Sequence, residues 1–182
     1  MIVLIRKYKS VLRFILTFLG SYLLLVLVYN AYLKYGGSTR FYPDFITHLV
    51  ARQSEYLINA LGYTAIIEPS TVEPAMNLTI NGTALARIVE GCNAVSIIIL
   101  FVAFMISFFE RWKRTLLYIF AGIVLIYAMN ITRIALLAIG IYKYPDYSHF
   151  LHGTVFPAIL YGTVLLLWLG WIRSYKAPVY EA

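Results

Sequence analysis

Charged residues are scarce in this sequence: they make up 13% of the 182 residues, whereas 62% are hydrophobic. An average soluble domain is about a quarter charged and about half apolar, so this composition excludes an ordinary globular protein. The chain has a single cysteine, Cys92, which excludes an intrachain disulfide and a cysteine-based metal site. It also has no phosphate-binding loop and no cluster of metal ligands, so we expect neither a metal nor an organic cofactor.

The net charge of +7 does not indicate binding to nucleic acid, because long apolar runs separate the basic residues and no basic face forms. Four of these runs are long enough to cross a bilayer, which takes about 20 residues per span. We therefore expect one membrane domain over residues 1–182, a mainly α-helical polytopic bundle of about four transmembrane helices. The predicted spans are at about 11–33, 92–109, 115–142 and 153–172.

Basic residues gather on one side of the predicted membrane. The first span lacks the small-x-small cleavage site of a secretory signal, so we expect it to remain as an anchor. By the positive-inside rule, we expect both termini in the cytoplasm and the chain in the cytoplasmic (inner) membrane. The basic residues on that side are Arg6, Lys7, Lys9, Arg13, Arg111, Lys113, Arg114, Arg173 and Lys176.

Residues 34–91 are the one substantial segment outside the predicted spans, and we expect them to form an extracytoplasmic α+β loop. Apolar residues between 41 and 61 are spaced as in an amphipathic helix, lying along the membrane surface or capping the bundle. Residues 63–67 predict a strand, and 76–89 predict a β-hairpin around the two-residue turn Asn81-Gly82. The hairpin leads directly to Cys92.

Three residues with chemical potential are expected at similar depth. Cys92 opens the second span, and His152 opens the fourth, with His149 one turn earlier. Counting about 20 residues from Arg114, at roughly 1.5 Å each, puts Arg133 near the outer boundary of the third span. Although they are far apart in sequence, Cys92, Arg133 and His152 are therefore expected to meet in one pocket on the outer side.

Each of these residues has a plainer explanation. A lone cysteine at a helix end more often packs than reacts, and a histidine near the interface is commonly just a polar residue there. Snorkelling to the surface is the plain explanation for Arg133. A guanidinium within a span nevertheless costs on the order of 3 kcal/mol and usually faces a partner or a wet cavity. Asn130, one turn away, is placed to orient it.

The three residues have a chemical logic together that none has alone. A thiol becomes a useful nucleophile when a neighbouring imidazole takes its proton and a fixed cation favours the thiolate. Arg133 is also suited to hold a substrate carbonyl or to stabilise the oxyanion of a tetrahedral intermediate. This combination is typical of acyl transfer.

The segments Glu90-Gly-Cys92-Asn-Ala-Val-Ser96, Asn130-Ile-Thr-Arg133 and His152 resemble the Cys, Asn-x-x-Arg and His signatures of the exosortase/archaeosortase family. The resemblance extends from about Arg87 to Trp171. It implies an intramembrane cysteine protease or transpeptidase that cleaves C-terminal sorting signals, made of a short motif, a membrane helix and a basic tail. The chain has fewer spans than many members, so it looks like a short bacterial member whose substrates the resemblance does not supply.

The resemblance implies that Cys92 is the nucleophile, His152 the base and Arg133 the oxyanion stabiliser, acting on exported proteins through a thioester. Water, or an amine of a lipid or glycan, would resolve that thioester. His149 stays an alternative base, although His152 is favoured because it begins the apolar run at a depth similar to that of Cys92. Two other functions fit the residues: a non-catalytic membrane assembly or scaffold protein, and a thiol-dependent lipid acyltransferase.

Overall fold

The computed structural model describes residues 8–36, 41–109 and 111–174 of the chain. Helices dominate these ranges, and they are joined by one small antiparallel sheet of three strands. The predicted fold class, a helical membrane bundle with a small β-hairpin, is confirmed. Three of the predicted cytoplasmic basic residues lie outside the described residues: Arg6, Lys7 and Lys176.

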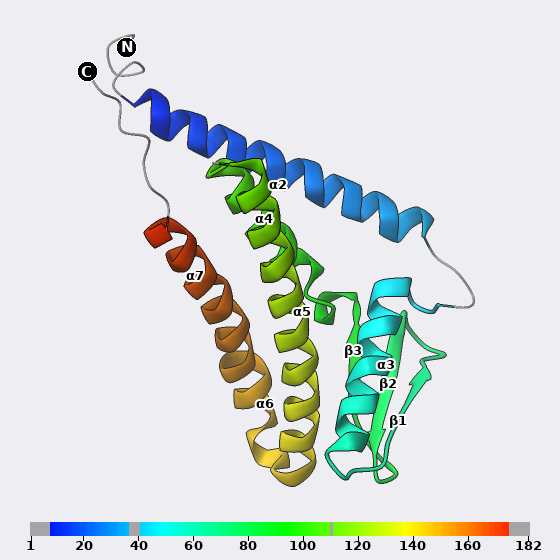
Figure 1. Ribbon diagram of the computed structural model, residues 1–182. Helices are drawn as coiled ribbons and strands as arrows, with labels where there is room; N and C mark the ends of the chain where they lie inside the picture. Colours follow the sequence, from blue (N-terminus) through cyan, green and yellow to red (C-terminus); the bar gives the residue numbers. More distant parts are fainter. Residues whose placement is uncertain (1–7, 37–40, 110, 175–182) are drawn as a thin grey trace.

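Three helical segments are long and apolar enough to cross a membrane, judged by length and composition in the described part of the chain. They are α2 (Lys9–Tyr35), α5 (Trp112–Lys143) and the segment Pro145–Ser174, which ends in α7 (Phe156–Ser174). Figure 1 shows α5 and α7 side by side, with α2 crossing one end of the bundle. The most apolar stretch of α2 has no buried residue, as expected of a surface that faces lipid.

The fourth apolar helix, α4 (Val95–Ser107), is shorter than the predicted span 92–109. At 1.5 Å per residue its 13 residues extend about 20 Å, against about 30 Å for the hydrocarbon core. The helix begins late because Glu90–Cys92 forms a 3₁₀ turn and Ala94 has a left-handed backbone conformation with φ of 63°. Cys92 therefore precedes the apolar helix and does not form its first turn.

The predicted loop contains one helix and three strands. The Asn81-Gly82 turn has positive φ at both residues, 50° and 78°, which is the type I′ geometry expected of a two-residue hairpin. The strands lie in the order β1-β2-β3, and one extra residue bulges from β3 where the register shifts. The elements are α3 (Phe45–Ala60), β1 (Ala65–Pro69), β2 (Ala75–Ile80) and β3 (Thr83–Val89).

The sheet, α3 and the C-terminal half of α5 share one apolar core. Ile58 of α3, Leu78 of β2 and Ala135 of α5 are among its fully buried members. Helix α3 was expected on the membrane surface or over the end of the bundle, and the structure places it against α5 and β1. The sequence could not choose this partner, because a single apolar stripe fits a helix surface or a membrane surface equally well.

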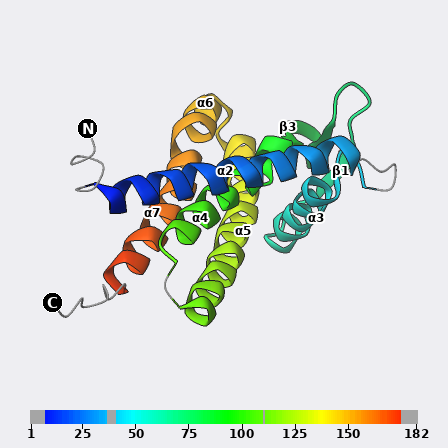
Figure 2. The ribbon, with the colours of Figure 1, turned by 90° about the horizontal axis from the view of Figure 1, so that it is seen from above.

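Helix α5 is longer than a bilayer requires. Its 32 residues extend about 48 Å, well beyond the hydrocarbon thickness of about 30 Å. The surplus is the half that packs against α3 and the sheet, around Ile134 and Ala138. Figure 2 shows the other end of the molecule, where α2 passes over α4. The candidate site lies between these two regions, along the middle of α5.

Candidate active site

Cys92 lies at the junction between the sheet and the helical bundle. Strand β3 ends at Val89, the 3₁₀ turn Glu90–Cys92 follows, and α4 begins three residues after Cys92. The thiol side chain is partly buried. A cysteine at this junction is fixed from one side by the sheet and from the other by the start of α4.

Asn93, which sequence reasoning did not single out, fastens this junction. Its side chain is buried, and its Nδ2 donates to Tyr29 Oη at 2.8 Å and to Thr47 Oγ1 at 3.0 Å. Its Oδ1 accepts from the backbone N–H of Val95 at 2.9 Å, satisfying one of the free donors at the start of α4. One amide therefore ties α2, α3 and α4 together beside Cys92. Its position, a polar residue directly before an apolar run, was the signal in the sequence that could have identified Asn93.

Asn130 and Arg133 form the second half of the site, one turn apart on α5. Asn130 is fully buried, and its Nδ2 donates to the backbone carbonyl of Cys92 at 2.7 Å. Its Oδ1 accepts from Nη1 of Arg133 at 3.3 Å. Nε of Arg133 is also buried and has no hydrogen-bond partner among the described residues. Asn130 thus hydrogen-bonds both to the Cys92 backbone and to the guanidinium of Arg133.

A small cavity brings the three predicted residues together. Cys92, Arg133 and His152 all line it, although each comes from a different segment of the chain. Its volume is about 40 Å³, which is enough for a water molecule or a carbonyl oxygen but not for a peptide side chain. The rest of the lining is mostly apolar: Leu78, Ala86, Arg87, Ile88, Ile134, Leu137 and Ala138.

A wider groove opens beside this cavity, and the two histidines differ in which of these spaces they line. It has a volume of about 580 Å³, and its walls are β3 on one side and the residues before α7 on the other. His152 and Arg87 line both the groove and the cavity, whereas His149 lines the groove alone. His152 lies in a single π-helical turn, Leu151–Val155, a feature frequent at functional sites. The structure therefore places His152, rather than His149, beside the thiol.

Arg87 is the second residue of this region that sequence reasoning did not assign to the site. It projects from β3 and forms an ion pair with Glu73, whose side chain also lines the groove. The predicted hairpin placed Arg87 on a strand, but only the packing of β3 beside α5 brings it to the cavity. Arg87 and Arg133 therefore both line the cavity of Cys92, with Glu73 partly offsetting the charge of Arg87.

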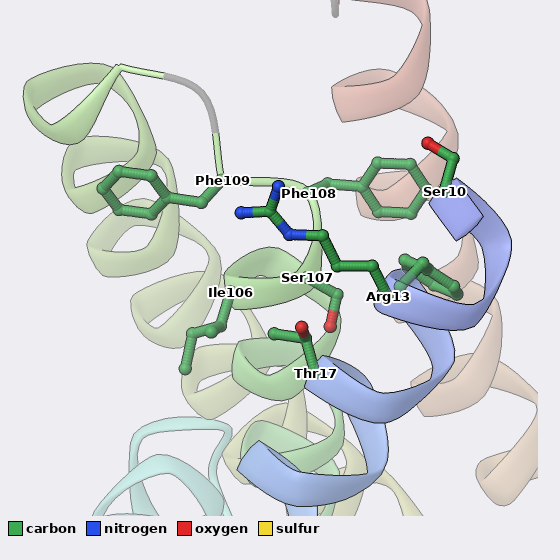
Figure 3. Close-up of a pocket in the computed structure, with 8 residues that line it drawn as sticks. Ser10, Arg13, Thr17, Ile106, Ser107, Phe108 and Phe109 are labelled. Carbon is green, nitrogen blue, oxygen red and sulfur yellow. The ribbon is translucent and has the colours of Figure 1, made fainter. Parts of the chain in front are cut away.

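Another cavity, of about 430 Å³, lies between α2 and the end of α4. Figure 3 shows Arg13 extending from α2 toward Phe108 and Phe109, with Ser10 and Thr17 on the same helix. No thiol, imidazole or carboxylate is among its described lining residues. It therefore lacks the groups needed for nucleophilic catalysis, and the Cys92 cavity is the stronger candidate despite its smaller volume.

The groups around Cys92 suit acyl transfer. A thiol, an imidazole and a guanidinium line a space the size of a carbonyl oxygen, which matches the needs of a nucleophile, a base and an oxyanion donor. No group of three or more metal-ligating side chains occurs among the described residues. The fold and the site together define a helical membrane protein with a cysteine-centred cavity.

Comparison with known families identifies the class more closely. Residues 2–170 match the family model of the transmembrane exosortases. The chain therefore belongs to the transmembrane exosortase family. Searches of curated proteins and of solved structures give no match to it.

Proposed function

We propose that this protein is a membrane-embedded cysteine peptidase or transpeptidase that cleaves C-terminal sorting signals of exported proteins. Membership of the exosortase family supports the class of reaction. The observation that carries the proposal for this chain is the shared cavity of Cys92, Arg133 and His152. Three polar groups from three segments of the chain line this one cavity, whose remaining lining is mostly apolar.

In the proposed reaction, Sγ of Cys92 forms a bond to the scissile carbonyl carbon while His152 accepts the thiol proton. The carbonyl oxygen becomes an oxyanion, and the guanidinium of Arg133, which lines the cavity, donates to it. The C–N bond then breaks, and His152 gives its proton to the leaving amine. The exported part of the substrate stays on Cys92 as a thioester, and the membrane helix with its basic tail leaves.

A second nucleophile resolves the thioester. An amine of a lipid or glycan, or a water molecule, attacks the same carbonyl carbon while His152 accepts its proton. The C–S bond breaks, and His152 returns the proton to the thiolate. The amine acceptor would give transpeptidation, and water would give hydrolysis.

We also propose an orientation in the inner membrane with the site facing the periplasm or exterior. Helix α5 begins directly after Arg111, with Lys113 and Arg114 in its first turn, and such charges favour the cytoplasmic side. Asn130 lies 18 residues from Trp112, about 27 Å along the helix. The Cys92 carbonyl, bonded to Asn130, would then lie near the outer limit of the hydrocarbon core.

The test is the processing of exported proteins in cells that carry single variants. Cys92→Ala and His152→Ala should cause uncleaved, membrane-bound precursors to accumulate while the variants are made at normal levels. His149→Ala separates the roles of the two histidines, since His149 lines the groove but not the cavity of Cys92, and it should lower processing less than His152→Ala. Normal processing with Cys92→Ala would contradict the proposal and favour a scaffold protein.

A further inference from the structure

The sheet has two edges, and they differ in whether their outward backbone groups are hydrogen-bonded. The edge at β1 is covered by α3: Asn59 bonds to both the N–H and the C=O of Ala65, at 2.7 Å and 3.2 Å. Glu55 Oε1 accepts from the N–H of Ile67 at 3.0 Å. These bonds occur at every second residue, as expected for backbone groups that point away from the neighbouring strand. Side chains of α3 thus satisfy this edge of the sheet.

The opposite edge, at β3, has no such cover. Strand β3 pairs with β2 on one side only, so every second residue directs its N–H and C=O outward. No described residue hydrogen-bonds to these outward groups. Open strand edges are templates for pairing with another chain, and proteins usually blunt them with charges, proline or bulges. Strand β3 contains no lysine or proline, its bulge lies near the hairpin end at Leu85, and its one charge, Arg87, is ion-paired with Glu73.

The open edge borders the groove that leads to Cys92. Leu85, Arg87 and Val89 line the groove, and they alternate along the strand as residues on one face do. The far wall is formed by residues before α7, including His149 and His152. The groove is therefore long, open and bounded on one side by unpaired backbone.

The edge also ends close to Cys92. Only Glu90 and Gly91 separate the end of β3 from Cys92. Ala86 and Arg87 of the same strand line both the groove and the cavity of Cys92. A chain that followed the edge of β3 would thus end beside the cavity that Cys92 lines.

We propose that the substrate binds as an extended strand along the free edge of β3, which makes it a fourth strand of the sheet and delivers its scissile bond to Cys92. This inference rests on the proposed peptidase function. Main-chain hydrogen bonds to β3 give the affinity, and alternate substrate side chains enter the groove. Because the proposed substrates have their membrane helix after the cleaved bond, the peptide runs parallel to β3, toward the membrane.

The test is disulfide cross-linking. Cys92→Ala removes the only native thiol and is expected to make the precursor accumulate. Single cysteines are then placed at Val89 or Arg87 of β3, and at Ile66 of β1 as the matched control on the other edge. The probe is an epitope-tagged form of the accumulated precursor, with single cysteines scanned through the residues that precede its membrane helix.

Cross-links from Val89→Cys are expected at every second position of the precursor. With Arg87→Cys the pattern should move two residues toward the precursor's N-terminus, and Ile66→Cys should give none. A three-to-four-residue period, equal yields from Ile66→Cys, or no cross-link from β3 would overturn the inference alone. If Cys92→Ala cells process every precursor normally, the proposed function fails and the inference fails with it.

Discussion

Two buried asparagines hold the polar groups of the site in place. Asn130 connects the Cys92 carbonyl to Arg133, and Asn93 connects α2, α3 and the start of α4. Buried amides of this kind are costly to disturb, because each partner left unpaired loses its hydrogen bond without regaining water. The two residues differ in what they hold, so their substitutions should have different consequences.

Asn130→Ala should impair processing more than it impairs folding. It leaves the Cys92 carbonyl and Nη1 of Arg133 without their bonds to Asn130, at a cost of about 1–3 kcal/mol in the free energy of unfolding. Displacing a reacting group by roughly 1 Å can lower a rate by about 100-fold. Pulse-chase measurement of precursor cleavage gives the rate, and thermal unfolding in detergent gives the stability.

Thr132→Ala is the control for this change, since Thr132 bonds only to the carbonyl of Ala128 within its own helix. It should leave the cleavage rate close to that of the wild type. Equal cleavage rates for Asn130→Ala and Thr132→Ala would show that Asn130 does not position the site.

Asn93→Ala should act mainly on stability. Three hydrogen bonds are lost at once, and the unpaired partners in the buried junction should lower the free energy of unfolding by at least about 1–3 kcal/mol. Tyr29→Phe removes one of the three bonds and should cost less, about 1 kcal/mol. Thermal unfolding of both variants tests which one loses more stability. A larger loss in the free energy of unfolding for Tyr29→Phe than for Asn93→Ala would contradict the prediction.

At the scale of elements, the contact between α4 and α5 depends on close approach. Gly122 of α5 faces the ring of Phe101 in α4, and a Cβ at Gly122 would overlap that ring. Both residues are buried. Small residues at helix contacts are typical of membrane bundles, where packing replaces the hydrophobic effect.

Gly122→Ala should therefore destabilise the bundle by about 1–3 kcal/mol, because Phe101 must leave its place. Gly162→Ala in α7 is the control, since nothing lies within 4 Å of the position that its Cβ would take. That change should be neutral or slightly stabilising, as alanine has the higher helix propensity. Thermal unfolding in detergent compares them, and equal losses would contradict the assigned contact.

The elements show where sequence reasoning works and where it stops. The Asn-Gly turn was enough to predict the hairpin, because few residues accept positive φ at two successive positions. The start of α4 was placed too early, since Glu90 to Ala94 gives no strong stop signal and the left-handed conformation of Ala94 arises from packing. Cavities lined by residues from several segments, such as the groove beside β3, are tertiary features without a local signal.

On the scale of the whole molecule, α5 joins two regions of different character. Its first half belongs to the apolar bundle, and its second half belongs to the core shared with α3 and the sheet. Counting residues along this helix was enough to predict that Arg133 and Cys92 line one cavity. It could not show that Arg87 also reaches the cavity, because that requires the strand to pack beside α5.

The proposed orientation predicts which residues a membrane-impermeant maleimide reaches in intact spheroplasts. In the Cys92→Ala background, Val72→Cys should be labelled, because Val72 is 90% exposed in the loop before β2. Lys113→Cys, at the start of α5, should be labelled only after the membrane is opened. Labelling of Lys113→Cys in sealed spheroplasts would mean that the chain is inserted the other way round.

The central claim is that Cys92 carries a substrate peptide as a thioester. Mass spectrometry of the Cys92-containing peptide, from wild-type and His152→Ala protein isolated from cells, tests it most directly, with Cys92→Ala as the blank. We predict that the wild-type protein carries a peptide on Cys92 that hydroxylamine removes, and that the His152→Ala protein carries much less of it, because the thiol then lacks its base. An unmodified thiol under all conditions would contradict the claim, and a fatty acyl chain in place of a peptide would indicate a lipid acyltransferase.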